Sequence, residues 1–173
     1  MRVVSPFVIN FASLKKGNHI FNFNIDIKFF ESFDYFDFKS VDLKTTLELE
    51  KQETMLGLLF KTSGHIIVPC DLSLENFKMP FLSNLSLAVK FGKTFSEESD
   101  EILILPHGSH QIDISQYIFE MVVLSIPIKK VHPGIKNGTL NSDILIKLNS
   151  LKPKEKKTQS ENDSRWDKLK DLL

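Results

Sequence analysis

The sequence predicts a mainly β, α+β fold in which an antiparallel sheet, barrel-like or strongly curved, packs against one helix. Three observations support this class. Short runs of apolar and β-branched residues follow one another, with brief polar connections, through the first 110 residues, as in antiparallel sheets. A capped apolar helix then begins near Ile114. The chain beyond it is rich in lysine and predicts an extension that ends in a short helix.

Composition places the chain among ordinary globular proteins. Of its 173 residues, 42% are hydrophobic and 25% are charged. A body of about 150 residues buries roughly 70% of its unfolded surface, so it needs no disulfide or other crosslink to be stable. The single cysteine excludes an intramolecular disulfide framework and fits a reducing compartment. Neither a signal-peptide core nor a run of about 18 apolar residues is present, so we expect a cytoplasmic protein without membrane contact.

The first strands are predicted from alternation. Residues 4–11 and 19–26 are rich in β-branched and aromatic side chains, and a Lys-Lys-Gly-Asn loop separates them. Over residues 21–26 apolar and polar side chains alternate strictly, as a half-buried strand requires. Residues 27–36 predict one or two helical turns, because four phenylalanines form one apolar stripe there. We interpret that stripe as core packing.

A hairpin and further strands follow. Residues 41–49 alternate between apolar and polar side chains, and the chain returns over residues 55–61 after a polar turn. Further strands are expected at residues 65–69, 77–91 and 101–105. The second of these is either one long strand or a strand broken at Pro80. Residues 96–101 (SEESDE) predict an acidic surface loop.

The helix near Ile114 has the clearest signals. Asp113 precedes it as a cap, with Gln116 three residues further on in the manner of a capping box. Pro127 ends it. Glu120 is either an ordinary exposed helix residue or a partner for a backbone amide or a lysine. The positions that follow the i, i+4, i+7, i+8 pattern are Ile114, Ile118, Met121, Val122 and Ser125.

The end of the chain predicts two short helices joined by a linker. Apolar side chains share one face between residues 140 and 151, which would close a single domain over residues 1–151. Residues 152–162 lack apolar side chains and predict a flexible lysine-rich linker. Residues 163–173 predict a helix too short to be stable alone, which must dock on the body or on a partner. The residues aligned on its apolar face are Trp166, Leu169 and Leu173.

Few residues have the spacing of catalytic or metal-binding sites. Structural zinc generally needs four cysteine or histidine ligands, yet Cys70 is followed three residues on by Ser73. Only His107 and His110 have a local ligand spacing. No glycine-rich phosphate loop or acid–base motif is present. We therefore expect no enzyme, no metal and no cofactor. A buried structural Cys70 is our interpretation, and a metal or thiol enzyme centred on it, with a histidine close in space, is the alternative.

Charge is divided unevenly along the chain. Residues 1–127 hold 11 basic and 16 acidic residues (net −5), whereas residues 128–173 hold 11 basic and 6 acidic residues (net +5). A cationic segment favours a polyanion, because lysine and arginine neutralise phosphate groups; a solubilising tail is the other interpretation. The residues predicted to contact this polyanion are Lys129, Lys130, His132, Lys152, Lys154, Lys156, Lys157 and Arg165.

Trp166 has two interpretations. Beside Arg165 it could stack on an unpaired base, which contributes about 1–3 kcal/mol. Alternatively it packs the apolar face of its own short helix, together with Leu169, against the body or a partner. We expect Trp166 and Leu169 to be docking residues, with Arg165 left for the partner.

Three short motifs resemble a known family. IDISQYIFEMVVLSIP resembles the signature I-D-(L/I)-x-(E/Q)-x-I-x-E-x-(I/V)-x-L-x-(L/I)-P of YceD-type proteins, also called large ribosomal RNA subunit accumulation proteins. DSRWDKLKDLL is similar to their closing D-P-R-W-x-x-L-x-x-L, with Ser164 in place of proline. VPCDLSLENF is similar to their V-x-C-x-R-C-L-x-x-F, with Leu72 and Ser73 in place of the arginine and the second cysteine. The pattern is similar to that of members from Bacteroidota.

The resemblance implies a non-enzymatic factor that supports the synthesis, processing or accumulation of large-subunit ribosomal RNA. Many relatives carry a second cysteine cluster after the helix-ending proline, where this chain has KKVHPGIKNG, so we do not transfer a zinc site. Two hypotheses stay open. The cationic residues contact large-subunit ribosomal RNA or its precursor directly, or the Trp166 helix docks on a ribosomal protein or an assembly factor without specific RNA binding.

Overall fold

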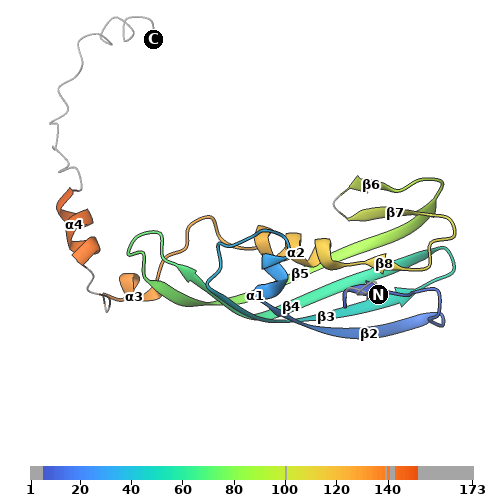
Figure 1. Ribbon diagram of the computed structural model, residues 1–173, viewed down its shortest axis with the longest axis horizontal. Helices are drawn as coiled ribbons and strands as arrows, with labels where there is room; N and C mark the ends of the chain where they lie inside the picture. The colour runs from blue at the N-terminus through green and yellow to red at the C-terminus, as the bar shows by residue number, and fades with distance from the viewer. Residues whose placement is uncertain (1–5, 100, 139, 141–142, 152–173) are drawn as a thin grey trace, which may run out of the picture.

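The computed structural model describes residues 6–99, 101–138, 140 and 143–151. A six-stranded sheet of order β2-β3-β4-β5-β7-β6 forms its centre, and a two-stranded sheet joins β1 to β8 (Figure 1). The strands are β1 (Val8–Ile9), β2 (Gly17–Asp26), β3 (Ser40–Lys51), β4 (Met55–Pro69), β5 (Asn76–Gly92), β6 (Ser96–Ser99), β7 (Ile102–Pro106) and β8 (Ile112–Asp113). The helices are α1 (Ile27–Glu31), α2 (Ser115–Leu124), α3 (Pro133–Lys136) and α4 (Asp143–Leu151).

The strands β2 to β5 form successive long antiparallel pairs. β3 and β4 pair from Ser40 opposite Ile67 to Lys51 opposite Leu56, without a shift of register. Side chains alternate between the two faces, and this alternation buries one face and leaves the other open. At Gly64 (φ +149°) an added Cβ would lie 2.2 Å from the Asp42 carbonyl oxygen, so glycine is required at this position of β4.

Aromatic rings fill the space between the buried face of the sheet and the helices. α1 and α2 lie on the same side of the sheet (Figure 1). Phe33 and Phe119 stack with ring centroids 4.5 Å apart, which joins the end of α1 to α2. Phe30, fully buried, meets Phe38 edge to face at 4.9 Å. Of the phenylalanine stripe predicted over residues 27–36, Phe29, Phe30 and Phe33 therefore pack in or against the core, whereas Phe36 is 66% exposed.

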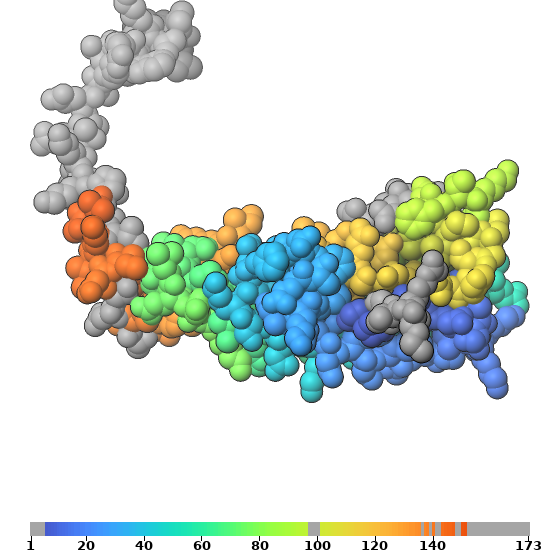
Figure 2. All heavy atoms as spheres, viewed as in Figure 1, coloured from blue at the N-terminus to red at the C-terminus, as the bar shows by residue number. Residues whose placement is uncertain are grey.

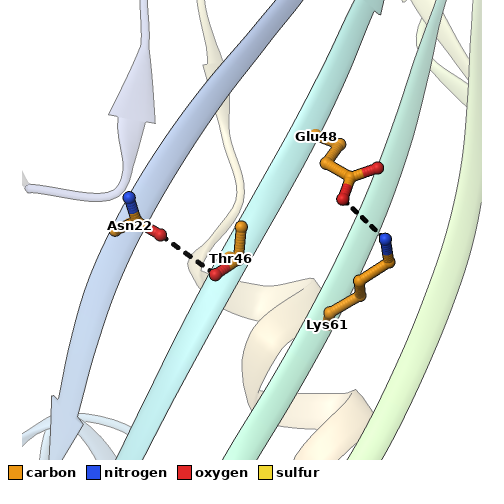
Figure 3. Close-up of polar contacts among 4 residues, drawn as sticks. All are labelled: Asn22, Thr46, Glu48 and Lys61. Atoms are coloured by element: carbon orange, nitrogen blue, oxygen red, sulfur yellow. Dashed lines mark hydrogen bonds and ion pairs between the residues drawn. The ribbon is translucent and has the colours of Figure 1, made fainter.

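The opposite face of the sheet is open and carries polar pairs between neighbouring strands. Thr46 Oγ1 donates to Asn22 Oδ1 at 2.9 Å, and Lys61 Nζ lies 2.6 Å from Glu48 Oε1 (Figure 3). Each pair joins residues that are opposite or nearly opposite in the strand register. Such contacts add small increments to sheet stability and keep this face wettable.

The mainly β class is confirmed, but the sheet does not close. β2 and β6 are its two ends, and no pairing joins them among the described residues, so a barrel is not found. β5 and β7 run parallel, which makes the sheet mixed and not purely antiparallel. Figure 2 shows the resulting elongated body, with β6 and β7 at the end opposite α4.

Several predicted strands differ in extent. The strand expected over residues 4–11 is reduced to β1, which pairs with β8. Residues 65–69 are the end of β4 and not a separate strand. Pro80 does not break β5, because β7 pairs only from Ala88 onward and β5 is an edge there, where proline is tolerated. The loop predicted at residues 96–101 is wrong in part, since β6 pairs with β7; a short acidic edge strand resists further pairing.

The predicted helix near Ile114 is confirmed, with different ends. Its buried face consists of Ile114, Ile118, Met121 and Val122, as predicted, whereas Ser125, the last position of the predicted pattern, is exposed. The residue at the N-cap position is Ile114, and Asp113 Oδ1 instead accepts from the Ser115 N–H at 2.9 Å. Gln116 donates to Glu120, an ordinary exposed residue, and so does not complete a capping box. The helix ends at Leu124, before Pro127.

The predicted helix between residues 140 and 151 is observed as α4, and α3 precedes it. The predicted linker (residues 152–162) and final helix (residues 163–173) lie outside the described residues. In the part of the chain that the structure covers, none of the helices is long and apolar enough to cross a bilayer.

Candidate functional site

The segment between α2 and α3 lies against the loop that follows β4, near α3 (Figure 1). Three hydrogen bonds join them: Asp71 N–H to the Lys130 carbonyl oxygen (2.8 Å), Lys130 N–H to Asp71 Oδ2 (2.6 Å) and His132 N–H to Cys70 Sγ (3.3 Å). We call these bonds of Cys70 and Asp71 with Lys130 and His132 the interloop contact. It fixes the backbone that carries the predicted RNA-contacting residues Lys129, Lys130 and His132.

Cys70 also organises its own loop. Its N–H donates to the Glu75 carbonyl oxygen at 2.9 Å, and its carbonyl oxygen accepts from Leu74 at the same distance. Leu74 has a φ of +61°, a left-handed conformation that lets the chain reverse within a few residues. The N–H groups of Leu72 and Ser73 both point to the Cys70 sulfur at 3.5 Å. The thiol is therefore the centre of a tight turn.

Opposing influences act on the Cys70 thiol. Burial is the largest of them and raises the pKa. The Ser73 hydroxyl and the backbone N–H groups of His132, Ser73 and Leu72 together outweigh burial, so the pKa lies below its ordinary value. Cys70 has no exposed surface, and its predicted burial is confirmed. The Ser73 hydroxyl is itself buried and makes no hydrogen bond of ordinary geometry within the described ranges.

The backbone and the ring of His132 contact different parts of the molecule. Its N–H meets the Cys70 sulfur, whereas its Nδ1 accepts from the Gly134 N–H at 2.9 Å and caps α3. Its ring packs edge to face on Phe77, with centroids 5.4 Å apart. The Nδ1 atom is thus engaged with the backbone of α3, and the contact of His132 with RNA stays a prediction.

The two lysines differ in their exposure to solvent. Lys129 is exposed and Lys130 is half-buried. The ion pairs found among the described residues are Lys16–Glu53 and Lys61–Glu48, and neither involves these two lysines. A phosphate group could therefore be neutralised here without first breaking an ion pair. The other predicted site residues lie outside the described residues: Lys152, Lys154, Lys156, Lys157, Arg165, Trp166 and Leu169.

Residues 58–173 match the family model of the large ribosomal RNA subunit accumulation protein YceD. This chain belongs to the YceD family. The match begins within β4 and includes both sides of the interloop contact and the cationic C-terminal segment. Among curated proteins and solved structures, none matches the chain significantly.

Sequence reasoning missed Asp71, which holds Lys130 from both its backbone and its side chain. One signal could have found it: VPCDLS belongs to a motif that resembles the YceD family, KKVHP follows another such motif, and these two segments meet. Metal ligands are not gathered at this place. Within the described residues, there is no group of three or more His, Cys, Asp or Glu side chains suited to a metal ion. His107 and His110, which have a ligand spacing in sequence, are both exposed.

Proposed function

We propose that this YceD-family chain is a non-enzymatic, cytoplasmic ribosome-biogenesis factor that contacts large-subunit ribosomal RNA or its precursor directly. The observation that carries the proposal is the interloop contact, which holds Lys129 and Lys130 at the start of a segment of net charge +5. The family match supports the link to large-subunit ribosomal RNA. The linker lysines and Arg165 continue the cationic segment in sequence.

The physical argument is preorganisation. A lysine on a free tail loses backbone and side-chain entropy when it binds a phosphate. At Lys130 the backbone is already held by two hydrogen bonds to Asp71, so only side-chain freedom is lost on binding. Lys129 and Lys130 would fix the position of the RNA on the protein. The rest of the cationic segment would add phosphate contacts that are less preorganised. Recognition would then depend on RNA shape or on unpaired bases.

The test is the salt dependence of binding to large-subunit ribosomal RNA. In the variant Lys129→Gln/Lys130→Gln we expect weaker binding at every salt concentration and a slope of log K against log salt reduced by about 1.4, since each contact to single-stranded RNA contributes about 0.7. The matched control is Lys78→Gln/Lys90→Gln, which removes two exposed lysines from β5. Unchanged affinity and slope in the first variant would remove this surface from the proposal.

A protein-interaction module is the second candidate. Ile128, directly before the two lysines, is fully exposed, as expected at a protein interface. If the chain acts through a ribosomal protein, a purified large-subunit protein will remain bound after nuclease treatment, and the lysine variant will bind RNA as the wild type does. Loss of binding after nuclease favours direct RNA contact.

A further inference from the structure

We propose that the C-terminal segment of this chain, residues 163–173, docks the face that carries Trp166 into an apolar groove between α2 and β5. The proposal concerns a surface separate from the interloop contact and does not depend on RNA binding. It assigns an occupant to the groove and a place to the short helix that the sequence predicts.

The groove has a volume of about 520 Å³ and opens between α2, β5 and the start of β7. Leu124 is 81% exposed, although it belongs to the groove wall. Half-buried Leu85 and Tyr117 pack against the core from the same region. The volume lies within the usual range of protein binding pockets, about 300–1,000 Å³. Its apolar lining consists of Leu85, Leu87, Ile102, Leu103, Tyr117, Met121 and Leu124.

The groove exists because the sheet is incomplete at this place. β7 pairs with β5 only from Ala88 to Gly92, and in the part of the chain that the structure describes no other strand pairs with the earlier residues of β5 on that side. α2 crosses near this free edge, and the hydroxyl groups of Ser83 and Ser125 meet at 2.6 Å to hold it there. Among the described residues, exposed Leu124 of α2 and half-buried Leu85 of β5 are thus left without a covering element.

The length of the chain beyond α3 allows the segment to reach the groove. The His132 ring, next to α3, lies 5.4 Å from Phe77 near the start of β5. Leu85 and Leu87 are eight and ten positions further along the strand, about 26–33 Å at roughly 3.3 Å per residue. Between α3 and residue 163 the chain has residues 137–142 and 152–162 outside α4, which together span up to about 56–61 Å when extended. This exceeds the distance along β5 even when the length of α4, about 14 Å, is added to it.

The chemistry of the segment complements the groove. Trp166, Leu169 and Leu173 recur at i, i+3 and i+7, so a helix would place them on one face. Most of its remaining positions are charged, with three basic residues (Arg165, Lys168 and Lys170) and three acidic ones (Asp163, Asp167 and Asp171), so the face opposite the apolar one is suited to solvent. A helix of this length needs a surface to form on.

Trp166 is the only tryptophan, so its fluorescence reports on docking in the full chain without a label. We expect a blue-shifted emission that is protected from acrylamide. In Leu124→Lys, and less completely in Leu124→Ser, the emission should move to the red and the protection should be lost. The matched control is Leu82→Lys on β5, since Leu82 is likewise strongly exposed (84%) but lies outside the groove lining, and this variant should leave the emission unchanged.

Three results would overturn the proposal. Wild-type emission typical of a solvated tryptophan would mean that the segment is left for a partner. Buried emission that ignores both Leu124 variants, with circular dichroism showing them folded, would place the segment elsewhere. Protection that disappears on dilution together with a dimer in light scattering would mean that a second copy fills the groove.

Discussion

The long strands β2 to β5 and the interloop contact are stabilised in different ways. The strands are joined by continuous in-register ladders and by alternating side chains, so each residue adds a small increment. The interloop contact depends on three hydrogen bonds between residues 59 to 62 positions apart. The comparison indicates that the stability of the sheet is spread over many residues, whereas two residues, Cys70 and Asp71, determine the position of the cationic residues.

The largest effect is expected inside the sheet. Thr45 and Thr62 are buried opposite one another, with their hydroxyl oxygens 2.7 Å apart. Thr62→Val leaves the Thr45 hydroxyl without its partner and should lower the free energy of unfolding by about 1–3 kcal/mol. The double variant Thr45→Val/Thr62→Val removes both hydroxyls and should restore most of that loss. Urea denaturation of the four proteins measures the coupling; strictly additive losses would contradict the pairing.

At the interloop contact we expect a smaller effect on the global free energy of unfolding and a larger effect on local amide exchange. Asp71→Ala removes the acceptor of the Lys130 N–H, so amide exchange at Lys130 and His132 should accelerate while the strands keep their protection. RNA binding should weaken less than in the double lysine variant, because the charges remain. Glu75→Ala is the matched control, since Glu75 contributes its backbone carbonyl to the same loop. Equal exchange in both variants would show that Asp71 does not hold this segment.

The smallest effect concerns pH. The pKa of Cys70 lies below its ordinary value in the folded protein, so the unfolded chain binds more protons between the two values. The stabilisation from the ionised Cys70 thiolate is fully present at a pH above the thiol pKa of the unfolded chain. It is lost as the pH falls through the lower thiol pKa of the folded protein. The free energy of unfolding should therefore rise with pH in the mildly alkaline range in the wild type. The rise should be smaller in Cys70→Ser; identical pH profiles would remove the thiol from this account.

The sequence predicts the strands well because their information is local. Alternation in residues 21–26 and 41–49 follows directly from the period of a half-buried strand, and β2 and β3 contain those residues. β6 was predicted as a loop, since a short acidic run has little strand propensity and its pairing depends on β7. The open, mixed sheet depends on the parallel pairing of β5 with β7, which no local pattern encodes.

The candidate site likewise has features that can be predicted from the sequence and features that depend on the fold. Lysine and histidine at positions 129, 130 and 132 are visible in the sequence as a cationic cluster. Their attachment to Asp71 and Cys70 is not, because a hydrogen bond across 59 residues has no periodicity to detect. Burial of Cys70 could be predicted from residue type alone. The hydrogen bonds that lower its pKa depend on the fold of the loop.

The most direct test of RNA contact is ultraviolet crosslinking in cells that express the full chain, followed by identification of the crosslinked peptides and the attached RNA. The account predicts large-subunit ribosomal RNA fragments attached to peptides from residues 128–173, with fewer crosslinks in Lys129→Gln/Lys130→Gln. Crosslinks confined to the open face of β2 to β5, or an absence of ribosomal RNA from the crosslinked material, would contradict it.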